Sequence, residues 1–123
     1  MSESKVLIVE DDPAVLVLAT QALRDAGLFV VQAESVDLAY DILEMSNKDI
    51  SVVFSDMETP GLLDGLHLSY VVARRWPDIQ VILTSGQSIS GVNSAPVAKF
   101  FSKPYDINSM AAFVGDLCGR EPH

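Results

Sequence analysis

Five short apolar runs rich in valine, isoleucine and phenylalanine constrain the fold of this chain most strongly. They lie near residues 5–9, 29–33, 51–55, 79–83 and 98–101. The runs are mostly continuous rather than alternating, which is typical of strands buried on both faces of a parallel sheet. Segments with helical periodicity separate them. We therefore predict an open α/β sheet with right-handed crossovers and helices on both faces.

Capping residues indicate where the predicted helices begin and end. Asp12 followed by Pro13 favours a helix start, because aspartate is a good N-cap and proline at the first helical position loses no needed hydrogen bond. Gly27 is a natural stop. Other helices are predicted from Ser35 to about Met45, from Asp64-Gly65 to Trp76-Pro77, and from about Ile107 to Cys118. The serine-rich and glycine-containing segment from Gln87 to Pro96 predicts only a short or distorted helix.

The first helix carries more apolar residues than one face needs. Its predicted core stripe consists of Val15, Leu18, Ala19, Ala22 and Ala26. Leu16 and Val17 lie beyond that stripe, where they would serve either additional core packing or contact with a partner protein.

Length and charge limit the classes of function. The 123 residues fit a single domain, which we expect to span residues 1–123. The net charge of −9, with only eight lysines and arginines, argues against direct binding to nucleic acid. No apolar stretch approaches the roughly 18 residues of a membrane span. The N-terminus lacks an export signal and Cys118 has no cysteine partner, so we expect a cytoplasmic protein.

Polar residues follow four of the predicted strands, and a doubly wound sheet of order 2-1-3-4-5 would gather them at one edge. Asp11 and Asp12 follow the first strand, and Asp56 ends the third, its neighbour. Three carboxylates so close repel one another unless a cation joins them, and all-oxygen ligands favour Mg²⁺. Thr84 would offer a hydroxyl and Lys103 an ammonium group. The set predicts phosphoryl transfer to the already ionised Asp56 carboxylate.

Each of these residues has an ordinary structural interpretation when it is taken alone. Asp12 could simply cap a helix, and Asp56 could cap the turn toward Pro60-Gly61. Thr84-Ser85-Gly86 and Lys103-Pro104 could be surface turns. Their occurrence in order at the ends of successive strands is what favours a functional site.

With these residues, the chain resembles the receiver domains of bacterial two-component response regulators. The likeness runs from Lys5 to about Gly119 and rests on Val-Leu-Ile-Val-Glu-Asp-Asp at 6–12, Phe-Ser-Asp-Met-Glu-Thr-Pro-Gly at 54–61, Asp64-Gly65, Leu-Thr-Ser-Gly at 83–86 and Lys103-Pro104-Tyr105. The resemblance implies a flavodoxin-like receiver fold. It also implies a phosphohistidine donor on a sensor histidine kinase or phosphotransfer protein, and a downstream protein partner. Such a domain would support its own phosphorylation and slow autodephosphorylation but would not otherwise be an enzyme.

The resemblance also assigns roles to individual residues. Asp56 is the expected phospho-acceptor, and Mg²⁺ is expected on Asp11, Asp12, Asp56 and the backbone carbonyl of Glu58. Thr84 and Phe100 are the expected switch residues, and Lys103 is expected to contact the phosphoryl group through a loop with a cis Lys103-Pro104 peptide. Glu58 and Gly86 occupy positions that tune hydrolysis in the family. Leu62-Leu63 makes the nearby loop longer, as in stand-alone receivers and receivers of hybrid kinases.

Two other functions fit the same residues less well. A Mg²⁺-dependent phosphohydrolase would need a lid or a further acid, which the sequence does not indicate. An inactive receiver-like interaction module would not need the complete set of active residues that this chain carries.

Overall fold

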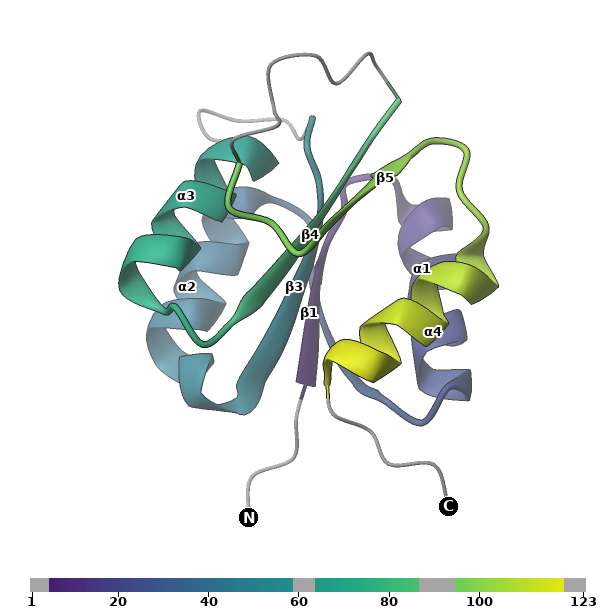
Figure 1. Ribbon diagram of the computed structural model, residues 1–123, viewed down its shortest axis with the longest axis horizontal. Helices are drawn as coiled ribbons and strands as arrows, with labels where there is room; N and C mark the ends of the chain where they lie inside the picture. Colours follow the sequence, from purple (N-terminus) through teal and green to yellow (C-terminus); the bar gives the residue numbers. More distant parts are fainter. Residues whose placement is uncertain (1–4, 59–63, 87–94, 119–123) are drawn as a thin grey trace.

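A five-stranded parallel sheet forms the centre of the molecule. The structure is a computed structural model that describes residues 5–58, 64–86 and 95–118. The strands are β1 (Lys5–Val9), β2 (Phe29–Ala33), β3 (Ile50–Asp56), β4 (Gln80–Ser85) and β5 (Lys99–Ser102). Their order across the sheet is β2-β1-β3-β4-β5 (Figure 1), which confirms the predicted topology.

Helices cover both faces of the sheet, as predicted. Figure 1 shows α1 (Pro13–Asp25) and α4 (Ile107–Leu117) on one side, and α2 (Val36–Ser46) and α3 (Gly65–Arg75) on the other. A short 3₁₀ helix, η1 (Asn47–Asp49), precedes β3. Asp12, Ser35, Asp64 and Asp106 cap the four α-helices. In the described part of the chain, every helix is too short or too polar to span a membrane.

Two predicted features fall partly or wholly outside the described ranges. Of the segment from Gln87 to Pro96, for which a short or distorted helix was predicted, the structure describes only residues 95–96. Leu62 and Leu63 also lie outside those ranges.

The apolar core consists of two clusters, one on each face of the sheet. Leu43, Leu68 and Leu83 belong to the cluster beneath α2 and α3, and none of these side chains is exposed to solvent. Leu23, Ile82 and Met110 belong to the cluster beneath α1 and α4 and are equally buried. Because β1, β3 and β4 contribute to both clusters, their positions and therefore the positions of their ends are held by packing on two sides.

The face that α1 turns toward the sheet differs from the predicted stripe. Leu16, Ala19 and Leu23 are buried, whereas Leu18 from the predicted stripe is 62% exposed. Val17 is also 62% exposed. Leu16 therefore serves core packing, because α1 docks with the side of its apolar surface that includes Leu16 toward the sheet. Periodicity alone could not select this face, since apolar residues lie on more than one side of the helix.

Gly65 lets α3 begin directly against the end of β3. A Cβ atom at this position would clash with the carbonyl oxygen of Asp56 and would lie 2.8 Å from Ser55 Oγ. The Gly65 N–H also donates to the Met57 carbonyl at 3.1 Å. The absence of a side chain at the first residue of α3 thus permits close contact with the backbone that carries Asp56.

Candidate functional site

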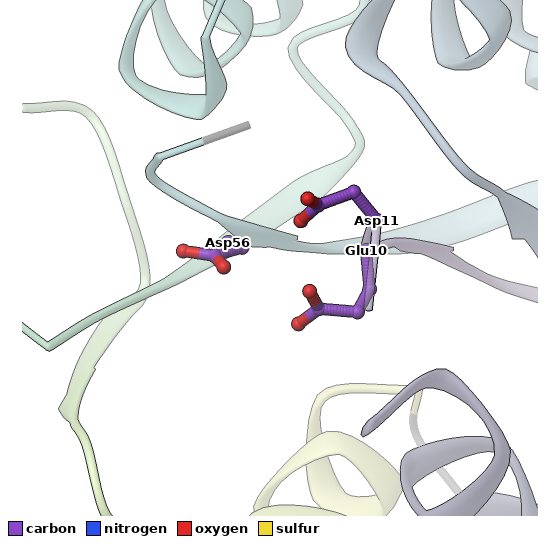
Figure 2. A group of neighbouring side chains, drawn as sticks. All are labelled: Glu10, Asp11 and Asp56. Atoms are coloured by element: carbon purple, nitrogen blue, oxygen red, sulfur yellow. The ribbon is translucent and has the colours of Figure 1, made fainter. Parts of the chain in front are cut away.

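Acidic side chains from two neighbouring strands meet at one edge of the sheet. β1 and β3 are paired up to Val9 and Ser55, so Glu10, Asp11 and Asp56 all follow the last paired residues. Carboxylate oxygens of these three residues all lie within 4.8 Å of one another. Figure 2 shows the Glu10 and Asp11 carboxylates extending toward Asp56. The predicted convergence of acidic residues at this edge is therefore present, but with one different member.

Asp12 is not a member of this acidic cluster, because its side chain caps α1 instead. Its Oδ1 accepts hydrogen bonds from the backbone N–H groups of Ala14 and Val15, at 2.9 and 3.4 Å. The Asp12 N–H in turn donates to Glu10 Oε2 at 3.1 Å. The expectation that Asp12 would converge with Asp11 and Asp56 is thus wrong, and Glu10 takes that position. The position of Asp12 directly before Pro13 was the sequence signal for this outcome.

Lys103 supplies the positive charge at the cluster. Its Nζ donates to Asp56 Oδ2 at 2.8 Å. The Lys103 side chain is about one-third exposed, whereas the Asp56 side chain is only 7% exposed. Burial alone would lower the pKa of Lys103, but the hydrogen bond and charge of Asp56, aided by the charge of Glu10, raise its pKa overall. The lysine is therefore an ammonium ion at neutral pH.

The charges of the cluster do not balance. Burial is the main cause that raises the pKa of Glu10, and the nearby charge of Asp56 raises it further, while the hydrogen bond from the Asp12 N–H acts in the opposite direction. Three carboxylates thus share one ammonium group, so a further cation would relieve their repulsion. A set of carboxylate oxygens within one small volume suits a hard divalent ion such as Mg²⁺.

The end of β4 lies directly beside Asp56. Thr84 is paired with Asp56 in the sheet, and the Thr84 carbonyl accepts a hydrogen bond from the Met57 N–H at 2.7 Å. The carbonyl of the next residue, Ser85, accepts a hydrogen bond from the Lys103 backbone N–H at 2.8 Å. The peptide between Lys103 and Pro104 is cis, which confirms that prediction.

Glu58 contacts Asp56 from the segment that follows β3. The Glu58 N–H donates to Asp56 Oδ1 at 3.1 Å, and its carboxylate accepts a hydrogen bond from Ser85 Oγ at 2.7 Å. The Glu58–Ser85 contact was not predicted from the sequence. Phe100, the predicted aromatic switch residue, lies on β5, where it is half-buried against the core cluster beneath α2 and α3.

The arrangement of these residues agrees with a comparison against protein families. Residues 6–114 match the model of the response regulator receiver domain. The chain belongs to the receiver domain family of two-component systems. The sequence resemblance is therefore confirmed across nearly the whole described sheet and its helices.

Relatives of this receiver domain occur in proteins with different overall functions. It is 31% identical over 120 residues to the sensor kinase CckA of Brucella abortus, and the aligned region covers 94% of this chain and 13% of the kinase. It is 32% identical over 111 residues to the DNA-binding transcriptional regulator NtrC of Klebsiella pneumoniae, covering 87% of this chain and 23% of NtrC. The chain thus spans less than a quarter of either relative. The single-domain organisation of residues 1–123 stays a prediction.

Solved structures confirm the receiver fold. A CheY-like receiver domain protein of Methanospirillum hungatei superimposes with a TM-score of 0.86 at 20% identity, covering 96% of this chain and 95% of that one. The response regulator TrrA of Thermotoga maritima, solved in complex with Mg²⁺-BeF, gives a TM-score of 0.81 at 22% identity, with 95% and 99% covered.

Proposed function

We propose that this receiver domain accepts a phosphoryl group on Asp56 from a phosphohistidine of a sensor histidine kinase or phosphotransfer protein. The observation that carries the proposal is the environment of the Asp56 carboxylate. One oxygen accepts from Lys103 Nζ at 2.8 Å and the other from the Glu58 N–H at 3.1 Å. An ionised carboxylate needs no general base in order to attack phosphorus, so the site requires correct placement rather than a proton acceptor.

The surrounding residues would stabilise charge on the transferred group. Lys103 is positioned to donate to a phosphoryl oxygen once Asp56 carries the phosphoryl group as an acyl phosphate, and Thr84 lies opposite Asp56 at the end of β4. Mg²⁺ bound beside Asp56 would supply further positive charge to the phosphoryl oxygens. We assign its ligands to Glu10, Asp11, Asp56 and the Glu58 backbone carbonyl, with Glu10 replacing Asp12 because of the observed cluster.

This ligand assignment predicts that the acidic residues on either side of Asp11 behave differently. Glu10→Gln should weaken Mg²⁺ binding at least about 10-fold, because the cluster loses a carboxylate. Asp12→Asn should change the affinity less than about two-fold, since asparagine caps a helix as well as aspartate does. Isothermal titration of both variants with Mg²⁺ distinguishes the two positions. A greater loss of affinity in Asp12→Asn than in Glu10→Gln would restore Asp12 to the ligand set.

Phosphorylation would change the conformation through Thr84 and Phe100. The Thr84 side chain would move toward the phosphoryl group, and the half-buried Phe100 ring on the neighbouring strand would repack, shifting a two-state equilibrium. Phe100 has no hydroxyl group, so its two positions would differ mainly in burial. The surface altered in this way would bind a downstream protein.

The proposal extends to location and to chemistry that the domain would not perform. We place the domain in the cytoplasm, where its kinase or phosphotransfer partner would present the phosphohistidine. Its acidic net charge of −9 supports protein partners rather than nucleic acid or membrane surfaces. Beyond its own phosphorylation and slow dephosphorylation, we propose no enzymatic turnover.

Incubation with acetyl phosphate tests this function without knowledge of the natural kinase. Intact mass spectrometry should show the gain of one phosphoryl group in the presence of Mg²⁺. Chelation of the metal with EDTA should reduce the initial rate at least about 100-fold, because the repulsion among three carboxylates and an incoming anion is then opposed only by Lys103. No mass gain under conditions that load an established receiver domain would contradict the proposal and favour the inactive interaction module.

A further inference from the structure

Ser85 contacts both charged residues that flank Asp56. Its hydroxyl donates to Glu58 Oε2 at 2.7 Å, and its carbonyl accepts the Lys103 N–H at 2.8 Å. These two residues in turn bind different oxygens of the Asp56 carboxylate. Ser85 is fully buried at the end of β4. Ser85 is therefore hydrogen-bonded both to Glu58 and to Lys103, the acidic and the basic residue that contact the Asp56 carboxylate.

The hydroxyl of Ser85 restricts a side chain that would otherwise be mobile. Glu58 is exposed, and an exposed glutamate ordinarily samples many rotamers. The Glu58 backbone nevertheless lies within hydrogen-bonding distance of Asp56, whose other oxygen contacts the Lys103 ammonium group. A glutamate starting from this position can extend toward that ammonium group unless another contact holds it.

We propose that Ser85 is a positioning residue whose hydroxyl holds the Glu58 carboxylate and so keeps it from pairing with the Lys103 ammonium group and from facing an incoming phosphoryl group. The inference rests on the proposed function, since it concerns the same acceptor. Without the Ser85 hydroxyl, Glu58 would compete with the phosphoryl oxygens for the Lys103 ammonium group. It would also add a negative charge where an anionic phosphoryl group must approach the acidic cluster.

The Ser85→Ala variant tests the role of the hydroxyl. Its initial rate of phosphoryl uptake from acetyl phosphate, at saturating Mg²⁺, should fall roughly 3- to 10-fold, the range expected for one hydrogen bond. In a Glu58→Gln background the same substitution should change the rate less than about two-fold, because the glutamine amide carries no charge that could pair with Lys103. A merely structural role of Ser85 would give the same loss in both backgrounds.

Ser69→Ala is the matched control. Ser69 is also fully buried, but its hydroxyl donates to the Leu66 carbonyl within α3, at 2.6 Å. This variant should retain the parent rate of uptake, and urea unfolding of all the variants should show that each is folded under the assay conditions.

The inference is overturned if Ser85→Ala takes up phosphoryl groups as fast as the parent or faster, or if it is slowed equally in both Glu58 backgrounds. These outcomes are distinct from failure of the proposed function, in which the parent protein itself gains no phosphoryl group and the inference fails with it.

Discussion

Replacing Asp56 with asparagine should abolish phosphoryl uptake from acetyl phosphate, with a loss of at least about 1,000-fold in initial rate. Asparagine has almost the same shape as aspartate, but its neutral amide has no ionised oxygen with which to attack phosphorus. The variant should remain folded, because the amide oxygen can still accept the hydrogen bond from Lys103 Nζ that Asp56 Oδ2 accepts in the parent. Intact mass spectrometry after incubation with Mg²⁺ measures the loss directly.

The matched control for this variant is Asp78→Asn. Asp78 is exposed in the turn between α3 and β4, at the opposite end of the sheet from Asp56. Its replacement removes the same charge and should leave the rate of uptake unchanged. If the Asp56→Asn protein still gained one phosphoryl group at the parent rate, the acceptor would have to be another residue.

Replacing Lys103 with methionine should lower the rate of phosphoryl uptake about 100- to 1,000-fold, the usual effect of removing one preorganised donor from a transition state. Methionine keeps much of the length and apolar stem of lysine but carries no charge. Asp56, whose side chain is only 7% exposed, would then face Glu10 and Asp11 without its ammonium partner. Quantifying the phosphorylated fraction over time by intact mass gives the rate.

Lys48→Met provides the control for the loss of a positive charge. Lys48 is exposed in η1, which precedes β3 and therefore lies far from the carboxyl ends of the strands. This variant should retain the parent rate within about two-fold, since exposed charges separated by more than about 10 Å are largely screened at ordinary ionic strength. A rate for Lys103→Met within a few-fold of the parent would show that its contact with Asp56 has no role in transfer.

The centre of the sheet could be predicted closely because β1, β3 and β4 are buried on both faces. All positions of β1 except the first are buried, and six of the seven residues of β3 are buried as well. Such strands read as uninterrupted apolar runs, so they stand out from the helical segments. The N-caps Asp12, Ser35 and Asp64 were also recognisable, because capping depends on side chains only a few residues from the backbone groups that they bind.

Topology then placed most of the candidate site. Once the strand order is known, the residues after β1, β3, β4 and β5 must share one edge of the sheet. Asp11, Asp56, Thr84 and Lys103 were assigned on this basis, and the structure brings Asp11 and Lys103 to Asp56 and pairs Thr84 with it. The choice between Glu10 and Asp12 could not be made in the same way, because both are acidic and each lies next to Asp11 after the same strand.

The tertiary structure decided the features that depend on the direction of a side chain. It turned Glu10 toward Asp56 and Asp12 toward the N-terminus of α1, selected Leu16 rather than Leu18 for the core, and joined Glu58 to Ser85. The fold and the edge of the sheet where the site lies could be predicted from periodicity, caps and strand order, and the family from the motifs that follow the strands. Contacts between residues distant in sequence depend on how helices and strand ends pack against each other, and no local pattern records that packing.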